Sequence, residues 1–62
     1  MYRQIRTAVA AVAEERLAKR VTALLAAAGL ELQYMAGDGY SAINAVLRLR
    51  PDLLIADQML PG

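Results

Sequence analysis

Residues 51–62 read PDLLIADQMLPG, and this stretch decides how the rest of the chain is interpreted. The first proline ends any preceding helix, because its ring and its missing N–H interrupt the helical hydrogen bonds. The apolar run that follows is typical of a strand covered on both faces of a sheet, here expected over about residues 52–57. This strand delivers a carboxylate, Asp57, to its C-terminal end, and a Pro-Gly turn signal comes shortly after it.

The residues before this stretch alternate between strand and helix patterns. The run TAVAAVA predicts a first buried strand at residues 7–13, although alanine also favours helices, and the pattern LELQYM predicts an edge strand at about 31–36. Apolar side chains at helical spacing predict helices over about residues 16–28 and 40–49. We therefore expect an α/β protein of order β-α-β-α-β, in which right-handed crossovers build a three-stranded parallel sheet.

Each predicted helix has an apolar stripe and a stop signal. Gly29 suits the position just after the first helix, and Arg48 and Arg50 favour the C-terminal end of the second. We expect the two stripes to face the sheet. They comprise Leu17, Val21, Leu24, Leu25 and Ala28 in the first helix and Ala42, Ile43, Val46 and Leu47 in the second.

Length and composition limit the possible functions. The 62 residues make at most one small domain, and a hydrophobic fraction of 58%, rich in alanine, predicts a thin core. The lack of Cys and His excludes disulfides, thiolate metal sites and a histidine base. A net charge of +1 gives no reason to expect nucleic acid or an anionic membrane as a partner. No apolar run is long enough to span a membrane, so the expected compartment is the cytoplasm.

Two groups of acidic residues are expected at one edge of the sheet. Glu14 and Glu15 follow the first strand, and Asp57 ends the third. Sites in open α/β sheets form beyond the C-terminal ends of the strands, so these carboxylates converge if the two strands are neighbours. Oxygen ligands without Cys or His suit Mg²⁺, which would offset negative charge while a phosphoryl group moves onto a nucleophilic carboxylate.

The stretch at residues 51–62 resembles the phosphoacceptor segment of response-regulator receiver domains. The acidic pair after the first strand and Asp38-Gly39 before the second helix are similar to that family as well. The resemblance covers about residues 7–62. It implies a single partial receiver domain over residues 1–62, with a flavodoxin-like fold and strand order 2-1-3. It also implies that Asp57 is the phosphoacceptor and that the ligands of Mg²⁺ are Glu14, Glu15, Asp57 and the backbone carbonyl of Met59.

The same resemblance implies a place in two-component signalling. The partner of the intact domain would be a sensor histidine kinase or a phosphotransfer protein, and the chain would be a phosphate acceptor and not an enzyme. The family usually has at least one Asp in its acidic pair, whereas this chain has two Glu, and whether Glu14 or Glu15 is the main ligand stays open. The family's fourth and fifth strands, with the Thr or Ser and the Lys that contact the phosphoryl group, have no counterpart in these residues. The chain alone is therefore expected to be inactive.

Other interpretations of the same residues stay open. The third strand would leave an open apolar edge, which favours a homodimer with a six-stranded sheet and a non-catalytic interaction module as the alternative function. A flavodoxin-like binder of a small ligand is a weaker alternative, because no loop rich in Ser, Thr or Gly follows the first strand. Asp57 could also simply end a strand, and Glu14 and Glu15 could be N-terminal helix acids that favour the helix dipole.

Overall fold

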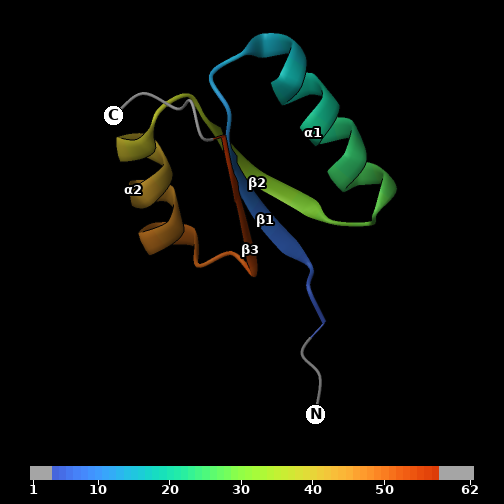
Figure 1. Cartoon of the computed structure of the whole chain (residues 1–62). Coiled ribbons are helices and arrows are strands. Elements are labelled where there is room, and N and C mark those ends of the chain that lie inside the picture. The colour runs from blue at the N-terminus through green and yellow to red at the C-terminus, as the bar shows by residue number, and fades with distance from the viewer. Residues whose placement is uncertain (1–3, 58–62) are drawn as a thin grey trace.

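A computed structural model of the chain describes residues 4–57. Three strands and two helices alternate along it: β1 Thr7–Ala11, α1 Glu15–Ala27, β2 Glu31–Ala36, α2 Gly39–Leu49 and β3 Leu53–Ala56. Both outer strands pair in parallel with β1, which gives one sheet of order β2-β1-β3 (Figure 1). The expected α/β class, the parallel sheet and the strand order 2-1-3 are confirmed.

The first strand is shorter than the apolar run that predicted it. β1 ends at Ala11, although the run continues to residue 13. Pairing with β2 continues one residue further, because the Val12 N–H donates to the Ala36 carbonyl at 3.0 Å. The chain then turns away from the sheet and begins α1 at Glu15, so the last apolar residues of the run lead into the helix.

The two helices end in different ways. After α1, the Gly29 N–H donates to the Ala26 carbonyl at 3.0 Å and the Leu30 N–H to the Leu25 carbonyl at 2.9 Å. Gly29 has φ +78, and this bond pattern with a left-handed glycine is the Schellman motif. After α2, the left-handed position is held by Arg50, with φ 49 and ψ 59, directly before Pro51. A side chain at that φ is strained, because its Cβ crowds the backbone.

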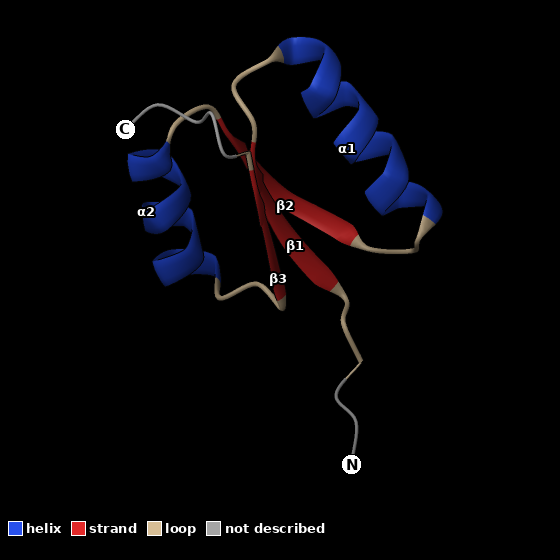
Figure 2. Ribbon diagram, in the orientation of Figure 1, coloured by secondary structure: helices blue, strands red, loops and turns tan. Residues whose placement is uncertain are grey.

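The helices lie on opposite faces of the sheet (Figure 2). Between them, the central strand is enclosed from Ala8 to Ala11, with 0% exposure, and Thr7 at its start is half-buried. Val9 is the largest fully buried side chain, and Ala11, Ala36 and Ala42 form a cluster between the sheet and α2. The core is therefore thin, as the alanine content predicted.

The expected apolar stripes are only partly correct. In α1, Leu25 is buried, but Leu24 is 69% exposed. In α2, the buried residues are Ala42 and Ala45, whereas Ile43 is 62% and Leu47 is 71% exposed, so the prediction that those two side chains face the sheet is wrong. Ala11 and Ala36 of the sheet lie against Ala42 of α2, and a helix that approaches a sheet closely does so with its smallest side chains.

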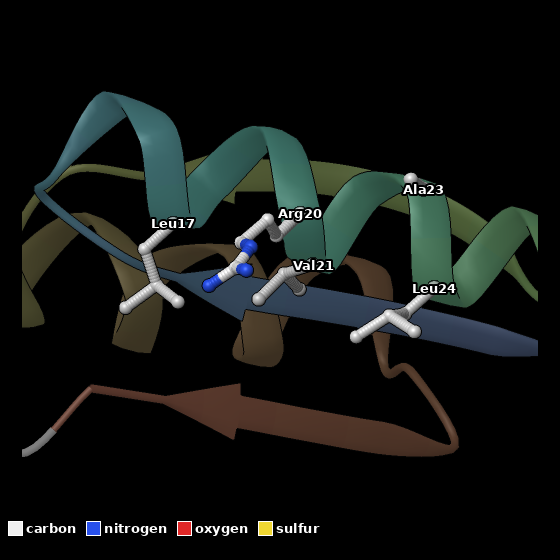
Figure 3. A pocket seen from close by; sticks show the side chains of 5 residues that line it. All are labelled: Leu17, Arg20, Val21, Ala23 and Leu24. Carbon is white, nitrogen blue, oxygen red and sulfur yellow. The ribbon is translucent and has the colours of Figure 1, made fainter.

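Both helices contact β1 and β2, and β3 is the least covered strand. Leu54 in β3 is 47% exposed. One flank of α1 borders a hollow of about 470 Å³, lined by Leu17, Arg20, Val21, Ala23 and Leu24 (Figure 3). Neither α1 nor α2 has the length and apolar character required to cross a membrane.

Candidate functional site

The fold brings Glu14 and Asp57 to the same edge of the sheet. β1 and β3 are parallel neighbours, and Ala11 at the end of β1 is the partner of Ala56 at the end of β3. The next residue, Asp57, donates its N–H to the Ala11 carbonyl at 3.0 Å. Asp57 is half-buried, and Glu14 follows the end of β1 by three residues and is exposed. The convergence of these two acidic positions at the C-terminal edge is therefore a property of the backbone.

Glu14 has a structural task in addition to its position. It is the N-cap of α1, with extended backbone angles, and its carboxylate accepts hydrogen bonds from two amides of the first turn. The Arg16 N–H donates to Oε1 at 3.0 Å and the Leu17 N–H to Oε2 at 2.8 Å. Both carboxylate oxygens are thus bonded to the helix, which satisfies two of its orphan N–H groups.

Glu15 is directed along the helix. Its Oε1 lies 3.7 Å from Nζ of Lys19, one turn further on, and its side chain is 82% exposed. Such an exposed pair at i,i+4 contributes little to stability. The interpretation of Glu14 and Glu15 as N-terminal helix acids is consistent with both arrangements.

The residues predicted to bind Mg²⁺ have suitable ligand atoms, but the structure does not gather those that it describes into one site. Asp57, Glu14 and Glu15 supply the hard oxygen ligands that Mg²⁺ prefers. Within residues 4–57, no three acidic side chains are gathered closely enough to form a metal site. Met59, the fourth predicted ligand, lies outside the described residues. The metal ligands and the role of Asp57 stay predictions.

Asp38, at the same edge, caps α2. Its Oδ1 accepts a hydrogen bond from the Ser41 N–H at 2.7 Å, and its backbone is extended. The turn that precedes the second helix in the sequence therefore ends in a capping residue, and Gly39 is already helical. Asp38 starts α2 as Glu14 starts α1, with a carboxylate on the first-turn amides.

Sequence reasoning missed Asp52, which connects β3 to β1 at the opposite edge. Its Oδ2 accepts hydrogen bonds from the Arg6 N–H at 2.9 Å, the Thr7 N–H at 3.2 Å and the Thr7 hydroxyl at 3.3 Å. Its own N–H donates to the Thr7 Oγ1 at 3.0 Å. The only sequence signal is an Asp just before one strand and a Thr at the start of another, which does not reveal that the two strands are neighbours.

Comparison with known proteins gives one consistent result. The chain is 46% identical over 46 residues to proteins described as DNA-binding response regulator MtrA from Mycobacterium tuberculosis, Mycobacterium leprae and Mycolicibacterium smegmatis. The match covers 74% of this chain and 20% of each relative, so it spans about a fifth of the relatives' length. No protein-family model matches the chain, and no solved structure matches it significantly.

The sequence match and the fold agree with each other. The similarity is to response regulators, and residues 4–57 form the parallel β2-β1-β3 sheet that the resemblance to receiver domains implied. One helix lies on each face of that sheet. The edge at which Asp57 lies is the one where sites form in sheets of this kind. The chain is therefore similar, in sequence and in fold, to response-regulator receiver domains.

Proposed function

We propose that Asp57 accepts a phosphoryl group within a two-component signalling pathway. The observation that carries the proposal is the position of this residue. Asp57 directly follows β3, and its N–H bond to the Ala11 carbonyl fixes its backbone beside the strand that leads to Glu14. The similarity to response regulators supports the same role. The donor would be a phosphohistidine of a sensor kinase or of a phosphotransfer protein.

The proposed step is a transfer between two side chains. A carboxylate oxygen of Asp57 attacks phosphorus, the bond between phosphorus and the donor's imidazole nitrogen breaks, and the imidazole recovers a neutral form by taking up a proton. The product is an acyl phosphate on Asp57. Bound Mg²⁺, held by carboxylates at this edge, would neutralise charge on the moving phosphoryl group. The chain is a stoichiometric acceptor in this scheme and not an enzyme.

We further propose that the 62-residue chain reacts weakly by itself. Glu14 uses both carboxylate oxygens to cap α1, at 3.0 and 2.8 Å from the two amides. Recruiting it to a metal would require at least one of these bonds to be exchanged. Since Mg²⁺ demands near-ideal octahedral geometry, this competition lowers its affinity for the site. A complete domain would have to offset that cost with further contacts.

The test is the intact mass of the chain after incubation with acetyl phosphate and Mg²⁺. Acceptance adds about 80 Da, and Asp57→Asn abolishes the gain. Glu31→Gln is the matched control, because Glu31 is an exposed carboxylate at the opposite edge of the sheet. A mass gain that persists in Asp57→Asn would disprove the assignment. The proposal of weak reactivity would be disproved if the unaltered chain gained as much phosphoryl mass as a complete receiver domain does.

A second candidate function is association with another copy through β3. Among the described residues β3 pairs only with β1, and it carries no charge, proline or bulge, while Leu54 is 47% exposed. The strand at the other side of the sheet, β2, is protected against such pairing. It begins with the charged Glu31 and has a register shift opposite Ala8 and Val9. An unprotected apolar edge favours strand pairing.

Sedimentation of the 62-residue chain at micromolar concentration tests this second function. Pairing of two β3 strands would give a dimer, and Leu54→Lys would return it to a monomer by placing a charge on the edge. Asp57→Asn would leave the dimer unchanged, which separates this function from phosphate acceptance. A folded chain that sediments as a monomer at all concentrations would refute it.

A further inference from the structure

A polar hollow lies between α2 and β2, on the side of the sheet away from β3. It has a volume of about 310 Å³ and is lined by Tyr34, Ser41, Asn44 and Arg48. Ser41, Asn44 and Arg48 are three and four residues apart, so they share one side of the helix. Tyr34 comes from β2, where it pairs with Val9. It lies two residues before Ala36, which packs against α2, so both residues are on the same face of the sheet. The hollow is therefore built by two separate elements.

The lining has a consistent chemistry. Each of the four side chains carries a hydrogen-bond donor: two hydroxyls, an amide and a guanidinium. Among the described residues, no carboxylate lines the hollow, and the only charged side chain that does so is Arg48. Within residues 4–57, Arg48 forms no ion pair with any acidic side chain. Its planar donor fork is therefore available to a ligand.

We propose that this hollow binds a phosphate group. Guanidinium forks match phosphate and carboxylate oxygens alike, so Arg48 alone would not distinguish the two. Ser41, Asn44 and Tyr34 add three further donors around the same space. A carboxylate has two oxygens to offer, whereas a phosphate has enough acceptors to occupy the fork and the additional donors together. The volume of about 310 Å³ is more than enough for a phosphate group.

The position of Arg48 in the last turn of α2 has a simpler partial explanation. A cation there interacts favourably with the helix dipole. That role does not require Asn44 one turn earlier or Ser41 two turns earlier. It does not require a tyrosine on the neighbouring strand either. The combination of donors is what points to a ligand.

This site is independent of the proposed phosphoacceptor. Asp57 follows β3, and the hollow lies at β2, on the other side of the central strand. Phosphate binding here involves no covalent step and requires no metal. The two sites can therefore be tested separately in the same chain.

The experiment is a titration of the ¹⁵N-labelled 62-residue chain with inorganic phosphate, followed by NMR. EDTA removes divalent cations, and sodium chloride keeps the ionic strength constant. We expect saturable shifts that share one dissociation constant, in the millimolar range, at Tyr34, Ser41, Asn44 and the Arg48 side chain. Acetate at the same concentrations should bind several-fold more weakly, because it engages fewer donors.

Variants decide whether the shifts report this site. Arg48→Gln should weaken binding by about tenfold or more, and Arg48→Lys should recover only part of it, since the fork is lost. Arg16→Gln is the matched control, an exposed arginine near the start of α1, and should leave the constant unchanged. Equal binding by Arg48→Gln would overturn the proposal, as would shifts that fail to saturate and spread over the arginines of α1. Equal affinity for acetate would reject the preference for phosphate.

Discussion

Two aspartates flank the same four-residue strand, and the fold gives them different surroundings. Asp52 precedes β3 and Asp57 follows it. The carboxylate of Asp52 accepts three hydrogen bonds from Arg6 and Thr7, which fasten β3 to the start of β1. Asp57 is held to β1 through its backbone N–H and lies at the edge where both helices begin. The chemistry of the side chain is identical, so the direction of the strand determines what each aspartate can do.

The difference follows from the direction of the parallel strands. At the N-terminal edge, the strands' first N–H groups point to an acceptor, and Asp52 provides it. At the C-terminal edge, the chain leaves the sheet for helices whose N-termini favour negative charge. Substitutions at the two aspartates and their neighbours test this difference between the two ends of β3.

The largest expected effect is on phosphate acceptance. Asp57→Asn should abolish the mass gain from acetyl phosphate completely, since no other carboxylate replaces the nucleophile. Asp52→Asn should retain the yield seen in the unaltered chain, provided that circular dichroism shows it to be folded. If instead both variants lose the gain while remaining folded, the distinction between the two edges is wrong.

The next largest effect is on stability, where we expect substitution of Asp52 to matter more than substitution of Asp57. Asp52→Ala should lower the free energy of unfolding by about 1–3 kcal/mol, because three donors lose their charged acceptor at a half-buried position. Asp57→Ala should cost less than Asp52→Ala, since the hydrogen bond from the Asp57 N–H to the Ala11 carbonyl is made by the backbone and survives the substitution. Urea unfolding measures both, and a larger loss for Asp57→Ala would contradict the structural role given to Asp52.

The Thr7 hydroxyl provides a second test of the structural role of Asp52. It donates to the Asp52 carboxylate at 3.3 Å and accepts from the Asp52 N–H at 3.0 Å. Thr7→Val keeps the β-branched shape and removes both bonds, so we expect a loss of about 1 kcal/mol. A double-mutant cycle with Asp52→Ala should show coupling between the two positions. Additive effects would mean that the hydroxyl does not act through Asp52.

Glu14 tests the competition between capping and metal binding. Glu14→Ala should destabilise the chain by about 0.5–2 kcal/mol through the loss of the N-cap of α1. Glu14→Ser is the informative partner, because serine can cap the helix but is a poorer Mg²⁺ ligand. It should recover most of the stability in thermal unfolding without recovering Mg²⁺-dependent phosphate uptake. Full recovery of both stability and Mg²⁺-dependent phosphate uptake would show that Glu14 is not a ligand of the metal.

The smallest expected effect is a gain. Arg50 ends α2 with φ 49, a conformation that glycine adopts without strain. Arg50→Gly should therefore raise the free energy of unfolding by up to about 1 kcal/mol, partly offset by the greater freedom of glycine in the unfolded chain. Arg48→Gly is the control, since it places glycine inside the helix and should destabilise. A loss of stability in Arg50→Gly would show that its side chain makes a contribution larger than the strain.

The sequence predicted the elements well because each has a local signal. Pro51, Gly29 and the apolar runs determine where helices stop and strands lie, and the resemblance at residues 51–62 supplied the strand order. Asp57 and Glu14 could be placed at one edge because that edge follows from chain direction. The bonds of Asp52 to Arg6 and Thr7 join residues 46 and 45 positions apart, and no local pattern carries them.

The orientation of the helices was predicted less well. Helical spacing put Ile43 and Leu47 on one apolar stripe with Ala42 and Val46, yet Ala45 is the residue that is fully buried. An apolar stripe favours the larger apolar residues, whereas close contact with Ala11 and Ala36 of the sheet selects small ones. The polar side of α2 that faces Tyr34 follows from the same rotation, which periodicity alone did not reveal.

The alanines of the central strand also change the entropy of folding. Burying an alanine costs almost no side-chain entropy, because its methyl group has no rotamers to lose, whereas leucine and isoleucine lose about 0.5–1 kcal/mol each. Ala8, Ala10 and Ala11 therefore release little energy on burial and forfeit little freedom. What they provide is a fixed distance between layers. A larger side chain at any of them would separate a helix from the sheet and shift the edge at which Asp57 lies.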